Sequence, residues 1–194
     1  VNINPKNPVI NTRSFGEDPV RVADKVVAYA SGLEGGGVLS VCKHFPGHGD
    51  TAEDSHYTLP AVHHDRARLD SVELLPFKRY IYDGYAGVMT GHLYVPALDK
   101  ARNKPVSMSR AVVTDLLQKE LGFRGLCFTD ALAMKGATTR KSDNPSVMAL
   151  LAGNDILLAP TAPINDFAAV KEALEEGILD REEIEAKIIK ILQY

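Results

Sequence analysis

The feature that most constrains the fold of this chain is an alternation of short apolar runs with amphipathic stretches. Four runs suit β-strands, at residues 38–45, 86–94, 125–131 and 155–160. Their apolar residues are nearly continuous rather than alternating, which is typical of parallel strands covered on both faces. The amphipathic stretches between them supply the covering helices. The order therefore predicts a parallel α/β fold.

Helix-start signals stand between the apolar runs. Asp18 precedes a proline at the first helical position, which predicts a helix through about residue 31. Asp70 with Glu73 three residues later has the capping-box pattern in its Asp variant and predicts a second helix over residues 74–82. Asp180 opens the last helix, whose apolar residues fall on one face: Ile184, Ile188, Ile189 and Leu192.

Polar residues recur where the predicted strands end, and this favours a barrel over an open doubly wound sheet. Lys43-His44, His92 and Asp130 each lie at or near such an end. In a (β/α)₈ barrel all carboxyl strand ends converge on one site. No glycine-rich phosphate fingerprint follows a strand. We therefore predict a single domain, residues 1–194, with a TIM (β/α)₈-type barrel fold that lacks its first βα units. Only four strands can be counted, or five if residues 1–4 are the tail of an earlier one.

Composition excludes several classes of function. The formal net charge of −3 and the pI near 6.1 give no basic stripe of the kind that binds nucleic acid. No apolar run approaches the roughly 20 residues of a membrane span. Cys42 and Cys127 lie in apolar runs, which predicts buried free thiols rather than a disulfide. The chain begins at Val1 without an initiator Met or a leader, so we expect it to be cut from a longer protein.

Residues 43–56 hold the highest density of chemically reactive side chains. They run from the end of a predicted strand into a loop and include His44, His48 and His56 among acids, glycines and a proline. One interpretation is a solvated polar loop. A metal site is another, although the first two histidines are separated by Pro and Gly rather than by one helical turn. General acid/base chemistry is a third, because Asp54 lies two residues before His56 and a carboxylate beside an imidazole raises its pKa.

Two further residues are candidates for function. Asp130 ends a predicted strand, and in a barrel a carboxylate at that depth is usually functional, whereas the alternative is an Asp that caps the following turn. Arg13 has no structural explanation in the sequence, so it either binds substrate or pairs with a nearby acid.

Three segments resemble family 3 glycoside hydrolases, and the resemblance runs nearly end to end. They are residues 12–19 (TRSFGEDP), residues 43–50 (KHFPGHGD) with 54–56 (DSH), and residues 128–130 (FTD). The DSH element resembles the β-N-acetylglucosaminidase branch in particular. The resemblance implies that Asp130 is the nucleophile, that His56 is the acid/base, and that Asp54 orients His56.

The same resemblance implies that Arg13, Lys43 and His44 hold sugar hydroxyls. It implies β-linked N-acetylglucosamine ends as substrates, including muropeptide fragments from peptidoglycan turnover, and neither a metal nor an organic cofactor. The bacterial cytoplasm and the periplasm or cell envelope are the compartments that it suggests. An incomplete barrel edge would favour self-association.

The chain departs from the family pattern in two respects. The Asp of the early barrel strands that binds the sugar has no counterpart, and Ala131 follows the nucleophile where many relatives carry a second Asp. Three alternatives stay open: a β-glucosidase or β-xylosidase of the same family, a metal-dependent hydrolase, and a catalytically silent carbohydrate-binding fragment.

Overall fold

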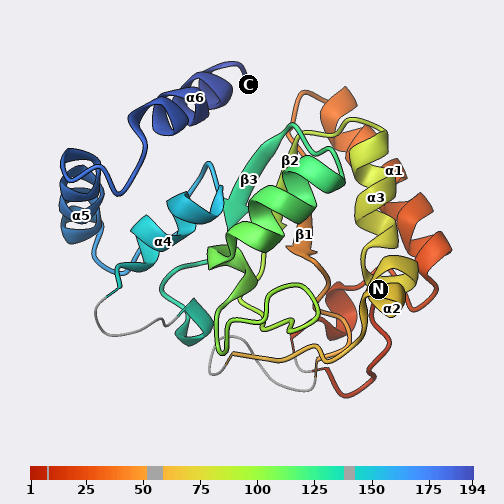
Figure 1. The fold of residues 1–194 in the computed structure, drawn as a ribbon. Coiled ribbons are helices and arrows are strands. Elements are labelled where there is room, and N and C mark those ends of the chain that lie inside the picture. The colour runs from red at the N-terminus through yellow and green to blue at the C-terminus, as the bar shows by residue number, and fades with distance from the viewer. Residues whose placement is uncertain (8, 52–58, 138–142) are drawn as a thin grey trace.

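A computed structural model describes residues 1–7, 9–51, 59–137 and 143–194 (Figure 1). The elements follow one another as η1 (Asn11–Arg13), α1 (Pro19–Gly35), β1 (Val41–Phe45), α2 (Arg66–Arg68), η2 (Leu69–Glu73), α3 (Leu75–Tyr82), β2 (Gly87–Thr90), η3 (Val106–Met108), η4 (Ala111–Glu120), β3 (Leu126–Thr129), η5 (Lys135–Ala137), α4 (Pro145–Ala152), α5 (Pro163–Glu175) and α6 (Arg181–Leu192).

The strands β1, β2 and β3 form a parallel sheet in chain order, as the sequence predicts. The register places Val41 opposite Gly87 and Gly87 opposite Leu126. Successive parallel strands require a crossover of a dozen or more residues, and helices supply it at each step. This α/β arrangement brings the carboxyl ends of the three strands to one edge of the sheet.

The fourth predicted strand pairs less extensively than expected. Ile156 forms an isolated parallel bridge with Phe128, and the amide of Thr129 donates to the carbonyl of Ile156 at 3.0 Å. The amide of Leu158 then donates to the side-chain hydroxyl of Thr129 at 2.9 Å. Backbone bonds resume beyond this contact, where the amides of Leu132 and Ala133 donate to the carbonyls of Leu158 and Ala159 at 2.9 and 3.1 Å. The two segments therefore stay side by side without forming a regular ladder.

The main hydrophobic core lies between the sheet and its helices. Phe45, Val88 and Cys127, one from each strand, are fully buried, and Leu74 and Leu117 pack with them from the helical side. Burying a side chain of this size stabilises the fold by roughly 1.5–3 kcal/mol. Helices α1 and α3 lie side by side next to β1 (Figure 1). The buried sheet thus fixes the backbone positions of the residues at the strand ends.

Two predicted helix starts are confirmed and one is wrong. Asp18 accepts from the amide of Arg21 at 2.8 Å, and Asp180 accepts from the amide of Glu183 at 3.0 Å. The helix predicted at residues 74–82 is present as α3, but helical structure already begins at α2, where Asp65 accepts from the amide of Arg68 at 2.8 Å. Asp70 instead pairs with basic side chains one and two turns away.

The apolar face predicted for α6 is not buried. Ile188, Ile189 and Leu192 have exposed fractions of 51%, 58% and 80%. Figure 1 shows α5 and α6 following one another at the end of the molecule away from α1. An ion pair attaches α6 to the rest of the fold instead, since the Lys190 ammonium lies 2.7 Å from the buried carboxylate of Asp155.

Both cysteines are free thiols, as predicted. Cys127 is buried, whereas Cys42 is only partly so. Burial raises the pKa of Cys42 to about 12 and that of Cys127 to about 11, so both thiols stay protonated and unreactive near neutral pH. Within the described residues, none of the helices has the length and apolar character to cross a bilayer.

Candidate active site

Asp130 lies directly after β3 and is fixed at the backbone. Its amide donates to the carbonyl of Thr90 on β2 at 2.9 Å, which extends the ladder beyond the last paired residue. Its Oδ1 accepts from the amide of Ala131 at 2.9 Å, so one carboxylate oxygen supports the turn. The other oxygen, Oδ2, faces His44, and the side chain is 15% exposed. Asp130 therefore stabilises a turn and also presents an oxygen toward a histidine.

His44 comes from β1 and faces this oxygen. Its Nε2 lies 3.6 Å from Asp130 Oδ2, and the side chain is 6% exposed. Burial lowers the pKa of His44 to about 3, although the Asp130 carboxylate opposes the shift. The imidazole is therefore neutral near pH 7, and its buried Nδ1 has no partner among the described residues.

His92 supports the peptide that follows Asp130. This fully buried side chain lies between the hydroxyl of Ser107, at 2.8 Å from Nδ1, and the carbonyl of Ala131, at 3.0 Å from Nε2. A carbonyl only accepts, so Nε2 must donate and Nδ1 must accept from the Ser107 hydroxyl. Burial lowers the pKa of His92, which agrees with this neutral form.

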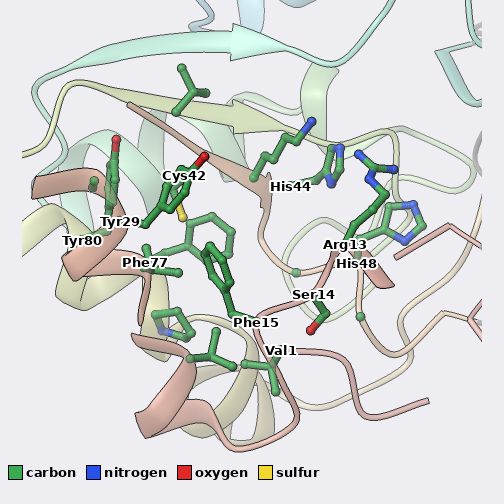
Figure 2. A pocket seen from close by; sticks show the side chains of 18 of the residues that line it. Val1, Arg13, Ser14, Phe15, Tyr29, Cys42, His44, His48, Phe77 and Tyr80 are labelled. Atoms are coloured by element: carbon green, nitrogen blue, oxygen red, sulfur yellow. The ribbon is translucent and has the colours of Figure 1, made fainter. Parts of the chain in front are cut away.

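A cavity of about 440 Å³ lies beside β1, and the three residues predicted to bind sugar are part of its lining. Arg13, Lys43 and His44 line it together with His48 (Figure 2). Figure 2 shows Arg13, His44 and His48 grouped at one end, with Phe77 and other aromatic side chains at the other. The structure thus brings Arg13 and His44, far apart in sequence, into one cavity.

The predicted acid/base pair, Asp54 and His56, lies outside the described residues. The chain on either side is described. Asp50 precedes this segment and His64 follows it, and His64 Nε2 lies 2.6 Å from Asp50 Oδ2. The described site therefore includes Asp130 but not His56.

Asp50, His64 and Glu73 offer ligand atoms within 4.8 Å of one another, a spacing that a divalent metal could use. Arg68 already provides the positive charge here, because its Nη2 lies 3.4 Å from Asp50 Oδ2 and 3.2 Å from Glu73 Oε1. We therefore treat these four residues as an ion-pair network.

Sequence reasoning missed one buried residue close to the strand ends. Asn154 is fully buried, accepts from the Thr90 hydroxyl at 2.9 Å, and donates to the carbonyls of Ser107 at 2.7 Å and Ala149 at 2.8 Å. The signal was a polar residue placed between Gly153 and an apolar run. Asn154 joins β2, η3 and α4 beneath the site.

The model of the glycosyl hydrolase family 3 N terminal domain matches residues 1–194. The chain belongs to glycosyl hydrolase family 3. This match confirms the family resemblance that the sequence showed, and it covers the whole chain.

Three similar proteins illustrate the relationship. Beta-hexosaminidase A of Pseudoalteromonas piscicida is 39% identical over 98% of this chain and 35% of its own length. A family 3 β-N-acetylglucosaminidase from Paenibacillus has a TM-score of 0.93 at 38% identity, over 100% of this chain and 37% of its own. The β-glucoside phosphorylase BglX has a TM-score of 0.92 at 28% identity, over 99% of this chain and 36% of its own. The chain therefore spans little more than a third of these relatives.

Proposed function

We propose that this chain carries the nucleophile of a retaining glycosidase that removes terminal β-linked N-acetylglucosamine, including that of muropeptide and other peptidoglycan fragments. The observation that carries the proposal is Asp130 at the carboxyl end of β3, with His44 of β1 at 3.6 Å. His44 also lines the cavity beside β1, although Asp130 does not. The similar β-hexosaminidase and β-N-acetylglucosaminidase support the choice of sugar.

In the first step, an Asp130 carboxylate oxygen attacks the anomeric carbon while the bond to the leaving oxygen breaks. His56 gives its proton to that oxygen, and Asp54 orients His56 and stabilises the imidazolium. A covalent glycosyl ester on Asp130 results.

In the second step, neutral His56 takes a proton from water, whose oxygen attacks the anomeric carbon and displaces Asp130. Two inversions give net retention. A histidine acid/base adds no second negative charge beside Asp130, whereas two close carboxylates would raise one another's pKa.

Arg13, Lys43 and His44 are proposed to hold the sugar. Their convergence on one cavity supports this role, since fixed donors position the ring for attack. His44 is neutral because burial lowers its pKa to about 3, so it offers a hydrogen bond without neutralising the nucleophile. We also propose that the observed βα units form part of a TIM (β/α)₈-type barrel.

The test compares an aryl β-N-acetylglucosaminide with the matching aryl β-glucoside, using this chain and its Asp130→Asn variant. We expect turnover of the first substrate only, and a loss of at least about a thousandfold in Asp130→Asn, because the amide is a poor nucleophile. Circular dichroism checks that the variant keeps its fold.

Other outcomes favour the alternatives. Preferential turnover of the glucoside points to a β-glucosidase-like activity, and a phosphate requirement points to a reaction like that named for BglX. Binding of N-acetylglucosamine without turnover indicates a silent carbohydrate-binding fragment. Activity that survives Asp130→Asn contradicts the proposed mechanism.

A further inference from the structure

The turn that carries Asp130 uses the two oxygens of this carboxylate differently. Oδ1 accepts from the amide of Ala131 at 2.9 Å, so it is engaged within the chain. Oδ2 faces the imidazole of His44, whose Nε2 lies 3.6 Å away. A hydrogen bond stabilises the charge on the oxygen that accepts it, so Oδ2 is the better nucleophile of the two. The direction of Oδ2 depends on how firmly Ala131 holds Oδ1.

Ala131 is held at both of its backbone polar groups. Its amide binds Asp130 Oδ1, and its carbonyl accepts from His92 Nε2 at 3.0 Å. The amide of Met134 donates to the same carbonyl at 3.0 Å. If Ala131 rotates about its backbone, its amide leaves Oδ1 and the carboxylate is free to turn. The orientation of Asp130 is therefore coupled to the bond that His92 makes with the next residue.

The His92 ring has one arrangement that satisfies its surroundings. It is fully buried, and its Nδ1 lies 2.8 Å from the hydroxyl of Ser107, which is also fully buried. Because the Ala131 carbonyl only accepts, Nε2 carries the proton and Nδ1 accepts from the hydroxyl. Ser107 is itself fixed, since its amide donates to Gly91 at 3.3 Å and its carbonyl accepts from Asn154 at 2.7 Å. A ring flip would leave buried polar groups unpaired.

The same strand end connects the Asp130 turn to His44. Gly91 directly precedes His92, and its amide donates to the carbonyl of Phe45 at 3.0 Å. Phe45 in turn directly follows His44. A Cβ at Gly91 would lie 3.2 Å from the His44 Cβ, so the two strand ends are packed at contact distance. Residues 91 and 92 thus link His44 on one side to the turn on the other.

We propose that His92 positions the nucleophile, because its hydrogen bond to Ala131 holds the turn in which Asp130 Oδ2 faces the sugar. Ser107 keeps the His92 ring in the tautomer that makes this bond. The inference rests on the proposed function. The printed bonds of His92 go to Ser107 and Ala131 rather than to the carboxylate, so it is a positioning residue and not a catalytic one. Displacement of a reacting group by about 1 Å costs on the order of a hundredfold in rate.

Three variants of the full chain separate positioning from stability. His92→Gln places an amide nitrogen near Nε2 and keeps the donor to Ala131, whereas His92→Asn places its amide near Nδ1 and loses that donor. Thr114→Val is the matched control, because it removes a different buried hydrogen bond, the 2.8 Å bond from Thr114 to the carbonyl of Ala152.

Three quantities are measured for each variant: the exchange rate of the Ala131 amide by NMR, the urea midpoint, and kcat and KM. The substrate is an aryl β-N-acetylglucosaminide with a poor leaving group. Attack by Asp130 then limits the rate, and KM approximates the dissociation constant.

We expect His92→Asn to lower kcat about thirty- to a hundredfold, while KM changes less than about twofold because the residues proposed to hold the sugar stay in place. Exchange of the Ala131 amide should rise at least about tenfold. His92→Gln should recover most of both losses. Thr114→Val should lower the urea midpoint but keep kcat within about twofold of wild type. Ser107→Ala, a smaller change, should lower kcat about three- to tenfold, and it decides the matter if His92→Asn does not fold.

Equal kcat values in His92→Asn and wild type would overturn the proposal. So would a loss of kcat that follows the urea midpoint in every variant, Thr114→Val included, because stability alone would then explain it. A wild type without turnover would contradict the proposed function for this chain. In that case faster Ala131 exchange in His92→Asn but not in His92→Gln would still support the positioning of the turn, and equal exchange in both would overturn it.

Discussion

At the scale of single residues, the candidate site depends on how burial determines the protonation states of its histidines. His44 and His92 are both neutral because burial lowers their pKa values, although each lies near Asp130. A protonated His44 would form an ion pair with Asp130 and reduce its nucleophilicity. The sequence indicated Asp130 and His44 by their places at strand ends, but the neutral state of His44 follows only from its 6% exposure.

This neutrality predicts how His44 couples stability to pH. The pKa of His44 is about 3 in the folded chain, below the ordinary histidine value, so the unfolded chain binds the extra proton first. The contribution of His44 to stability is therefore present above the unfolded pKa and is lost as pH falls toward the folded one. The slope reaches about 1.4 kcal/mol per pH unit. Urea unfolding of wild type and His44→Asn at several pH values should show a shallower acid loss in the variant.

His63→Asn, a change at an exposed position, provides the control and should keep the wild-type slope. Parallel pH profiles for wild type and His44→Asn would contradict the assignment of a depressed pKa to His44.

At the scale of elements, the sequence predicted the parallel strands and the helix starts at Asp18 and Asp180, because these depend on local pattern. It was wrong about Asp70, since the competing cap at Asp65 was better placed. It could not predict the irregular pairing of the fourth strand around the Thr129 hydroxyl contact, or the network of Asn154. Contacts between distant side chains leave no periodic signal.

Asn154 supplies a prediction at this scale. Asn154→Ala removes three buried hydrogen bonds that join β2, η3 and α4. We expect the free energy of unfolding to fall by about 3 kcal/mol, because the Ser107 and Ala149 carbonyls and the Thr90 hydroxyl each lose a partner. Urea denaturation measures the change. Asn165→Ala, on exposed α5, should change stability by less than about 0.5 kcal/mol, and equal effects of the two variants would refute the role of Asn154.

At the scale of the whole molecule, the sheet ends at β1 within the described residues. Val38 and Leu39, just before this strand, are 56% and 46% exposed. Exposed strand edges favour pairing with another chain. We propose that this chain self-associates through the β1 edge.

Sedimentation velocity tests this proposal. Wild type should form a dimer or larger species as its concentration rises, and Leu39→Lys should shift the equilibrium toward monomer because a charge disfavours edge pairing. Ile164→Lys is the control, since Ile164 lies on α5 and is 86% exposed. Dissociation by Ile164→Lys but not by Leu39→Lys would place the contact elsewhere.

The central claim is that Asp130 forms the covalent glycosyl-enzyme, and trapping that intermediate tests it most directly. The chain is incubated with a fluorinated, slowly hydrolysed aryl N-acetylglucosaminide, digested at acid pH, and analysed by mass spectrometry. We expect a glycosyl adduct on the peptide that contains Asp130, and none in Asp130→Asn. An adduct on another residue, or turnover of an unmodified substrate with no trappable adduct, would contradict the account.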